Sequence, residues 1–137
     1  MVQAFETIEE IREFFKNDGF VSSCLKAHID SYDFETGEAQ VSMDIKENHL
    51  NGHGIVMGGV YFTLADFCLA VCANVNQEPS ASVSNTINTM KSAKGTRLIA
   101  KGAPNRSGHH LGFYTVDVFD DLGTYCARMT ATIMRLA

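Results

Sequence analysis

Asp66 is the side chain in this 137-residue sequence that points most clearly to chemistry. Histidines aside, it is the only acidic or basic residue between Glu47 and Glu78, and it lies inside the apolar segment GVYFTLADFCLAV. A buried carboxylate must be hydrogen-bonded, protonated or beside a water-filled cleft. Held in a pocket, it is suited to act as a general base or a nucleophile. Bonded to a neighbouring hydroxyl such as that of Thr63, it would have only a structural role.

Two glycines, Gly58 and Gly59, come at the expected start of the helix that carries Asp66. Backbone N–H groups at a helix N-terminus have no intrahelical acceptor and lie at the positive end of the helix dipole. Without Cβ atoms, two glycines allow a ligand oxygen to approach these donors closely. The pair therefore suits an oxyanion hole that polarises a carbonyl group, although a tight turn that requires glycine explains the same residues.

The helical rise keeps these two features apart. Asp66 follows Gly58 by eight residues, which is roughly 12 Å along a helix at about 1.5 Å per residue. One carbonyl carbon cannot contact both groups of the same helix. A site that uses both must take Gly58 from one subunit and Asp66 from another, across a two-fold axis. We therefore expect a homodimer with shared sites.

Residues 1–23 are expected to form an N-terminal helical extension. Thr7 and Glu10 match a capping box, in which each side chain accepts a hydrogen bond from the other residue's backbone. Apolar residues then recur at helical spacing, and Asn17-Asp18-Gly19 ends the helix. The apolar stripe, which we expect to pack on the rest of the chain, consists of Ile8, Ile11, Phe14 and Phe15.

From about Cys24 the pattern changes to the two-residue period of strands. Residues 39–46 alternate between apolar and polar, and Glu35-Thr36-Gly37-Glu38 predicts a hairpin turn from a strand near Lys26–Phe34. Connections as short as those that follow predict that the last four strands are antiparallel neighbours in chain order. The turn-like breaks between these strands are Gln77–Ser80, Lys91–Gly95, Pro104–Gly108 and Asp120–Gly123.

The helix expected at Gly59–Val75 is apolar nearly all round, which is typical of a helix buried on most sides. One curved antiparallel sheet can bury it in this way, and a second copy of the chain would cover any face left open. We therefore predict a single α+β domain over residues 1–137. In it, about six antiparallel strands wrap around a central helix, and the N-terminal helix is added outside.

Composition and charge exclude several classes of function. A net charge of −5 and a pI near 5.4 argue against nucleic-acid binding, which depends on a basic patch. The acidic N-terminus does not resemble a secretory signal, and Asp66 disfavours a membrane span. We expect a cytoplasmic protein with reduced thiols and no metal site. The cysteines, which form no CxxC pair and no zinc-like spacing with histidine, are Cys24, Cys68, Cys72 and Cys126.

Two stretches of the sequence carry a family resemblance. NGHGIVMGGVYFTLAD, followed by the apolar helix and then VSNTINTMKSAKG, resembles the hot-dog-fold acyl-CoA thioesterases, and among them the phenylacetic-acid-degradation thioesterase-like group. The resemblance covers the chain from about Cys24, with the first helix as an addition. It implies a sheet wrapped around a central helix, a side-by-side dimer and often a tetramer made of two dimers.

The same resemblance implies roles for individual residues. Asp66 matches the catalytic carboxylate, as general base or nucleophile, and Gly58 matches the glycine whose backbone N–H polarises the thioester carbonyl. Asn51 matches the loop asparagine near the thioester. A Ser or Thr on the following strand commonly helps to hold the water. The candidates, which we expect to share one strand face with Ser82 slightly favoured, are Ser82, Ser84 and Thr86.

One position departs from the family pattern, since Met57 stands where the family usually has histidine. His53, four residues upstream, either compensates or is an ordinary loop residue. The phosphates of coenzyme A would be bound by basic residues in turns, where Lys94 and His110 are also found. Residues predicted to contact the substrate are Gly59, Met57, His53, Phe62, Ser84, Lys91, Arg106 and His109.

The predicted activity is hydrolysis of a medium-chain or aromatic acyl-CoA to free acid and coenzyme A, with no cofactor beyond the coenzyme A of the substrate. Phe62, Tyr61 and Leu69 would line the acyl pocket. Two alternatives stay open. A non-catalytic acyl-CoA-binding protein would not need Asp66. A hot-dog dehydratase or hydratase would normally need a histidine with the acid, and Met57 counts against it.

Overall fold

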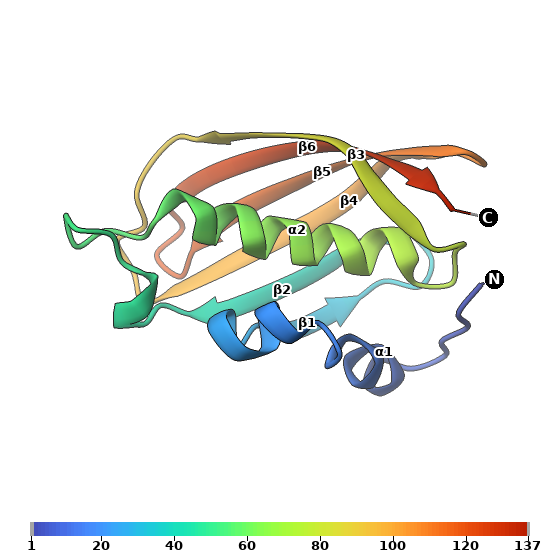
Figure 1. Ribbon diagram of the computed structural model, residues 1–137, viewed down its shortest axis with the longest axis horizontal. Coiled ribbons are helices and arrows are strands. Elements are labelled where there is room, and N and C mark those ends of the chain that lie inside the picture. Colours follow the sequence, from blue (N-terminus) through green and yellow to red (C-terminus); the bar gives the residue numbers. More distant parts are fainter. Residues whose placement is uncertain (1, 137) are drawn as a thin grey trace.

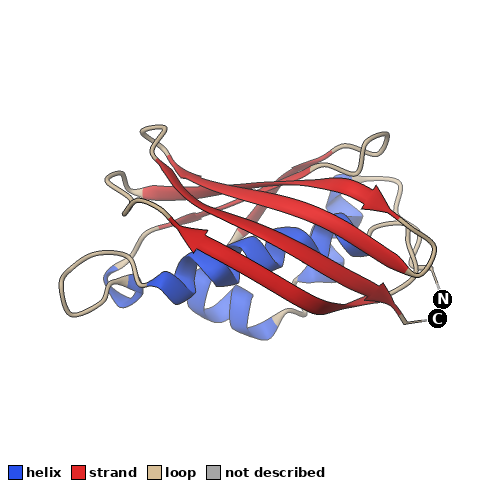
Figure 2. Cartoon of the chain, turned by 90° about the horizontal axis from the view of Figure 1, so that it is seen from above, coloured by secondary structure: helices blue, strands red, loops and turns tan. Residues whose placement is uncertain are grey.

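A six-stranded antiparallel sheet wraps around one long helix, α2 (Gly58–Asn74), in the computed structural model, which describes residues 2–136 (Figure 1). The sheet order is β1-β2-β4-β5-β6-β3. Figure 2 shows the helices gathered on one face of the sheet. The expected α+β architecture is therefore confirmed. The strands are β1 (His28–Tyr32), β2 (Ala39–Asp44), β3 (Ser80–Thr89), β4 (Arg97–Ser107), β5 (Leu111–Asp120) and β6 (Tyr125–Arg135).

The N-terminal helix α1 (Ile8–Phe15) forms as predicted, with both hydrogen bonds of the Thr7–Glu10 capping box in place. Its Ile11 and Phe15 side chains are buried. The start of the first strand was predicted too early, because Val21–Leu25 forms a short π-helix, η1, which ends at Lys26 in a left-handed conformation (φ 50°). Among residues 2–136, none of the helices is long and apolar enough to span a membrane.

The helix α2 is buried on nearly all sides, as its composition predicts. Gly102 on β4 makes this packing possible: a Cβ atom there would lie 2.8 Å from the Cys72 sulfur and 2.9 Å from the Cys68 sulfur. Both thiols are buried in the core. One strip of α2 stays partly exposed, and it consists of Gly59, Phe62, Thr63, Asp66 and Ala70.

The prediction that the last four strands pair in chain order is wrong for the first of them, β3. β3 pairs with β6 at the edge of the sheet, and not with β4, so the segment 90–96 must cross the ends of β6 and β5. Asp120 makes this crossing possible, since its buried carboxylate accepts the backbone N–H groups of Lys94 (2.8 Å) and Gly95 (3.0 Å). Burial alone would raise the pKa of the Asp120 carboxyl, but these donors and the N–H of Thr124 outweigh it and lower the pKa.

The break predicted at Pro104–Gly108 also lies elsewhere. β4 continues to Ser107 through an irregularity in its pairing with β5 between Pro104 and Arg106, and the turn follows at residues 108–110. Proline has no backbone N–H to donate to a ladder, so a bulge is one of the few places in a sheet that accept it.

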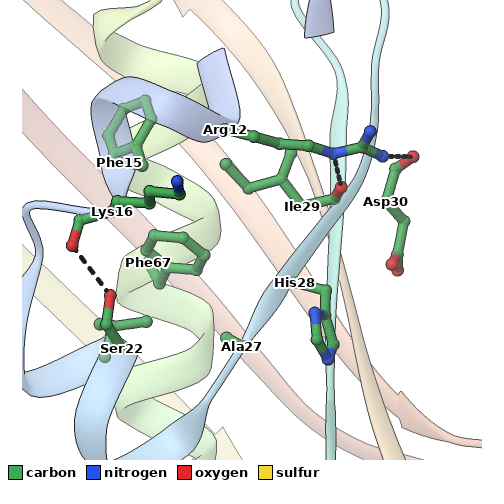
Figure 3. Close-up of a pocket in the computed structure, with 10 residues that line it drawn as sticks. Arg12, Phe15, Lys16, Ser22, Ala27, His28, Ile29, Asp30 and Phe67 are labelled. Carbon is green, nitrogen blue, oxygen red and sulfur yellow. Dashed lines mark hydrogen bonds between the residues drawn. The ribbon is translucent and has the colours of Figure 1, made fainter. Parts of the chain in front are cut away.

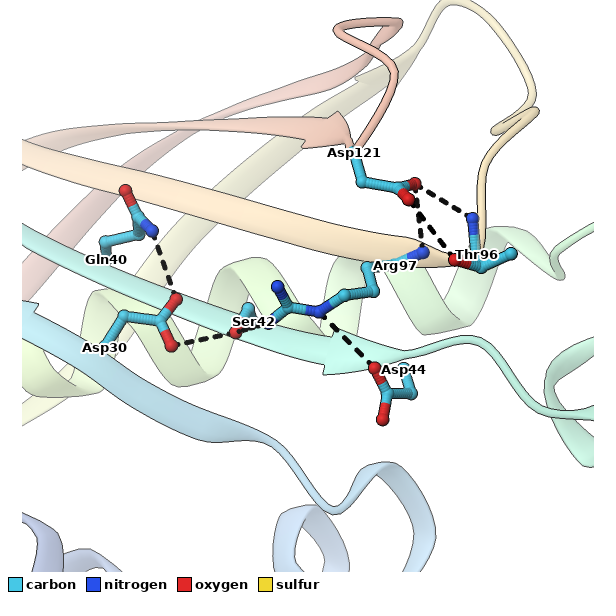
Figure 4. A network of polar contacts seen from close by, with 7 residues as sticks. All are labelled: Asp30, Gln40, Ser42, Asp44, Thr96, Arg97 and Asp121. Carbon is cyan, nitrogen blue, oxygen red and sulfur yellow. Dashed lines mark hydrogen bonds and ion pairs between the residues drawn. The ribbon is translucent and has the colours of Figure 1, made fainter.

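Polar side chains tie β1, β2 and β4 together along one side of the sheet (Figure 4). Ser42, which the alternation of β2 places on the polar side, is fully buried under Arg97. The Arg97 guanidinium donates to Ser42 Oγ (2.7 Å), which donates in turn to Asp30 Oδ1 (2.9 Å). Arg97 also pairs with the exposed carboxylate of Asp44 at 3.3 Å, a contact typically worth less than about 1 kcal/mol.

Candidate active site

Asp66 on α2 and Ser82 on β3 line the same pocket, of about 180 Å³. The Asp66 carboxylate accepts no hydrogen bond within the described part of the chain. Thr63, the hydroxyl that offered a structural explanation, donates instead to the carbonyl of Gly59 (2.8 Å). The half-buried carboxylate of Asp66 therefore borders an open pocket and is not held by a hydrogen-bond donor. Its other lining residues are Leu69, Ala70, Ala73, Asn74, Ser80 and Ile133.

The environment of Asp66 favours its protonated form. Burial raises the pKa of the carboxyl, and the negative charge of Asp18 raises it further. Asp18 is half-buried between α1 and η1, and desolvation raises its own pKa as well. No sequence pattern connects these two acids, which are 48 positions apart. A carboxyl whose pKa is moved toward neutrality is a better proton acceptor at neutral pH than an ordinary aspartate.

The prediction that Ser82, Ser84 and Thr86 share one strand face is wrong. The pairing of β3 with β6 shifts register between Ser82 and Ser84, so that one extra residue, Val83, intervenes. Ser82 faces α2 and lies opposite the buried Ile133, but Ser84 and Thr86 lie opposite Thr132 and Thr130 on the other face of the sheet. A bulge of this kind reverses the side-chain alternation that follows it.

Asn85 takes the inward position that this shift creates, opposite the buried Ala131. Its Oδ1 atom is buried and has no hydrogen-bond partner among the described residues. Sequence reasoning missed Asn85, because the bulge that turns it inward has no signature in the strand pattern. A buried oxygen without a hydrogen-bond donor costs folding free energy, so a donor placed beside Asn85 would stabilise this part of β3.

The loop that precedes α2 is held by Asn51. Its Oδ1 accepts the backbone N–H groups of His53 (2.9 Å) and Ile55 (3.4 Å). His53 itself is exposed. This arrangement fixes the loop through the oxygen of the Asn51 side chain and leaves the amide nitrogen available.

Gly58 is the first residue of α2, and Met57 is its N-cap without a capping side chain. The Gly58 N–H has no acceptor within residues 2–136. Met57 is 51% exposed, and its methyl group lies over Gly59, where an added Cβ would be 3.1 Å away. The N-terminus of α2 thus offers a free, exposed backbone donor of the kind predicted for carbonyl polarisation.

Within one chain, the structure does not bring the predicted catalytic residues together. Asn51 and Gly58 lie at the N-terminal end of α2, whereas the Asp66 pocket extends to Asn74 and Ser80 at the C-terminal end. The predicted phosphate contacts are divided in the same way. Lys91 follows β3 near the N-terminal end of α2, while Arg106 and His109 lie at the far end of β4. The two groups lie at opposite ends of β4, and the nine positions of this strand from Arg97 to Arg106 span roughly 30 Å.

A larger cavity, of about 320 Å³, lies between α1, η1 and β1 (Figure 3). Its apolar part includes Phe15 and Phe67, whose ring centroids are 6.0 Å apart. Arg12 borders the cavity and donates through Nε to the Ile29 carbonyl (2.9 Å). None of the predicted site residues lines this cavity. Because Phe15 packs on Phe67 and Arg12 donates to Ile29, its residues attach the N-terminal segment to α2 and to the sheet.

Comparison with known proteins agrees with this fold. Residues 53–127 match the family model described as the thioesterase superfamily. The acyl-coenzyme A thioesterase PaaI of Escherichia coli is 29% identical over 106 residues, which cover 76% of this chain and 73% of PaaI. The structure of the E. coli PaaI protein from the phenylacetic acid degradation operon superposes with a TM-score of 0.86 at 24% identity, covering 95% of this chain and 93% of that one.

A further structural neighbour is a hypothetical thioesterase protein of Streptococcus pneumoniae, solved with coenzyme A. It superposes with a TM-score of 0.81 at 22% identity, and the match covers 90% of this chain and 97% of that one. The matched segment contains Gly58, Asp66 and Ser82, and Asn51 lies two positions before it. The chain therefore belongs to the thioesterase superfamily, as a hot-dog-fold thioester hydrolase of the PaaI type.

Proposed function

We propose that this protein is an acyl-CoA thioesterase that uses Asp66 to activate water. The observation that carries the proposal is the state of Asp66, a half-buried carboxyl with a raised pKa that accepts no hydrogen bond and lines a pocket beside Ser82. Two comparisons support the substrate class. The PaaI relative is named as an acyl-coenzyme A thioesterase, and the S. pneumoniae protein was solved with coenzyme A.

The proposed reaction needs only water as its second reactant, and no cofactor. Asp66 takes a proton from the water held beside Ser82, and the oxygen of that water attacks the thioester carbonyl carbon. A backbone N–H of Gly58 stabilises the negative charge that forms on the carbonyl oxygen. The C–S bond then breaks, Asp66 passes the proton it took from water to the thiolate of coenzyme A, and the acid is released. A nucleophilic role for Asp66 would form an acyl anhydride that water opens in a second step.

We propose further that each site is shared by two subunits. Asp66 lies roughly 12 Å from Gly58 of its own helix, so the donor for its thioester would be Gly58 of the partner subunit. β3 supports this arrangement because it is an edge strand of ten residues whose Val83 side chain is 60% exposed. The partly exposed strip of α2 is a surface that a second copy would cover.

The acyl group is proposed to be medium-chain or aromatic. Phe62 on the partly exposed strip of α2 and Leu69 in the Asp66 pocket offer apolar surface next to the carboxylate. Lys91 lies at one end of the sheet, and Arg106 and His109 lie at the other. The phosphates of one coenzyme A would therefore contact different ends of two subunits.

The test is a panel of short-chain, medium-chain and aromatic acyl-CoA substrates, scored by thiol release with purified protein. We expect turnover that is highest for a medium-chain or aromatic substrate, and loss of turnover in Asp66→Asn with coenzyme A binding retained. Coenzyme A binding without turnover of any substrate in the parent protein would support a non-catalytic binding protein. Equal turnover in the parent and in Asp66→Asn would show that Asp66 is not the base.

A further inference from the structure

His49 is a buried histidine, 4% exposed, whose two ring nitrogens both contact the backbone. The Lys46 N–H donates to Nδ1 at 2.9 Å, and Nε2 lies 2.8 Å from the carbonyl oxygen of Cys24. Because a carbonyl only accepts, Nε2 carries the hydrogen, and because Nδ1 accepts, it carries none. The ring is therefore the neutral Nε2–H tautomer, and both of its polar atoms are used.

The backbone of His49 is connected to the start of α2. Its carbonyl accepts the N–H of Met57 at 3.0 Å, and Met57 is the residue immediately before Gly58. Between these two residues the loop is closed by a bridge between Leu50 and Val56 and by a hydrogen bond from the Asn51 N–H to the Ile55 carbonyl (2.8 Å). The loop is therefore closed by its own backbone hydrogen bonds, and His49 and Met57 form its base.

Three parts of the chain meet at His49. The ring joins η1, through Cys24, to the end of β2, through Lys46, and the carbonyl joins both to α2 through Met57. No other side chain in the described part of the chain makes a hydrogen bond to this loop base. The ring thus sets where the backbone carbonyl of His49 points, and with it the position of the N-cap residue of α2.

We propose that His49 is a positioning residue for the carbonyl-polarising donor: its neutral ring fixes the loop base that holds the Gly58 N–H toward the thioester. The inference rests on the proposed function, in which that N–H stabilises the oxyanion. A donor of this kind acts only when it is held close to its productive position, since a misplacement of about 1 Å can cost about a hundredfold in rate. A displaced loop would lower kcat, with little effect on the binding of the coenzyme A portion.

Two substitutions separate the two hydrogen bonds of the ring. His49→Asn keeps an acceptor near the position of Nδ1 and loses the donor to Cys24. His49→Gln keeps a donor near the position of Nε2 and loses the acceptor for Lys46. The exposed His28 on β1 provides the matched control, His28→Gln. The substrate is the acyl-CoA that the parent enzyme turns over fastest.

We expect His49→Gln and His49→Asn, each of which loses one of the two hydrogen bonds of the ring, to lower kcat about tenfold or more with KM changed less than about twofold, and His28→Gln to have no effect. Amide hydrogen exchange gives a readout that does not depend on activity. The Met57 N–H should exchange faster in His49→Gln than in the parent, at an unchanged melting temperature. If His49→Gln does not fold, the comparison of His49→Asn with the parent replaces it, and unchanged Met57 protection together with unchanged kcat in His49→Asn would overturn the proposal.

Gly58→Pro, which removes the donor itself, distinguishes this inference from the proposed function. If Gly58→Pro lowers kcat and His49→Gln has no further effect in that background, both are supported. If His49→Gln lowers kcat by the same factor with and without Gly58→Pro, the histidine acts elsewhere and the inference fails while the donor role of Gly58 stands. Full kcat in Gly58→Pro would overturn the donor role and the positioning role together.

Discussion

Asp66 on α2 and Ser82 on β3 face one pocket, although they are 16 positions apart in the chain. The bulge at Val83 places Ser84 on the opposite face of the sheet. We expect Ser82→Ala to lower kcat about tenfold or more, because it removes a hydroxyl that orients the water, and Ser84→Ala to change kcat less than twofold. Thiol release by the two variants, with melting temperatures as the folding control, tests this pair. Equal losses of kcat in the two variants would show that Ser82 has no special role in the reaction.

Asp66→Asn is expected to lower kcat by about 10²–10⁴, the usual contribution of a general base. It should also make the protein more stable at neutral pH. Burial raises the folded-state pKa of Asp66, so the folded protein binds the proton more tightly than the unfolded chain, whose aspartate pKa is about 3.9. The contribution of Asp66 to stability therefore falls as the pH rises through the window from the unfolded to the folded pKa.

Melting temperatures of the parent and of Asp66→Asn at pH 4 and pH 7 measure this effect. The variant should melt higher than the parent at pH 7, and the difference should shrink at pH 4, where the carboxyl of the parent carries less negative charge. A parent that is more stable than Asp66→Asn at pH 7 would mean that the carboxylate is held by stabilising contacts.

Asp18→Asn is expected to move the pH dependence of hydrolysis. Burial is the larger cause of the raised pKa of Asp66, and the charge of Asp18 is the second. Removal of that charge lowers the pKa of Asp66, so the base is ionised at lower pH and the acid limb of kcat/KM moves to lower pH. Asp44→Asn, at an exposed acid on β2, is the control that should leave the profile unchanged. An unmoved acid limb in Asp18→Asn would show that the two carboxyls are not coupled.

Gly58→Pro removes one hydrogen-bond donor while keeping the helix. Proline is favoured at the first helical position, and the preceding Met57 already has the extended conformation that proline requires (φ −65°, ψ 139°). We expect kcat to fall about 10²–10³-fold, as when an oxyanion-hole donor is lost. Gly58→Ala, which keeps the N–H and has open space for its Cβ, should fall much less.

Mixing Gly58→Pro with Asp66→Asn tests the shared site. If each site combines Gly58 of one subunit with Asp66 of the other, every mixed dimer has one intact site, and random mixing restores about a quarter of the parental activity. Mixed dimers shown by native mass spectrometry to exist, but without recovered activity, would place both residues in one subunit's site.

Gly102→Ala is expected to destabilise the protein by about 1–3 kcal/mol, because its Cβ would overlap the sulfur atoms of Cys68 and Cys72 in a packed core. Gly19→Ala, with nothing near its added Cβ, is the control and should change stability by less than about 0.5 kcal/mol. Chemical denaturation of both variants measures the difference. A Gly102→Ala protein as stable as the parent would show that the two thiols can move aside.

Much of the fold follows from local patterns along the chain. The capping box at Thr7 and Glu10, the alternation in β2, β5 and β6, and the apolar composition of α2 each depend on residues within a few positions of one another. The pairing of β3 with β6 does not. It depends on the carboxylate of Asp120 holding the crossing segment from about 25 residues away, and no local period carries that information.

Composition and helical spacing are enough to single out Asp66, to separate it from Gly58 along one helix of 3.6 residues per turn, and to predict a sheet around the helix that carries both. The side chains that join them follow from packing between distant segments. One extra residue in β3 turns Ser82 inward and Ser84 outward, packing brings Asp18 toward Asp66, and the buried ring of His49 connects the loop before α2 to Cys24. These relationships depend on contacts between distant segments, whereas a sequence pattern reports only on residues a few positions apart.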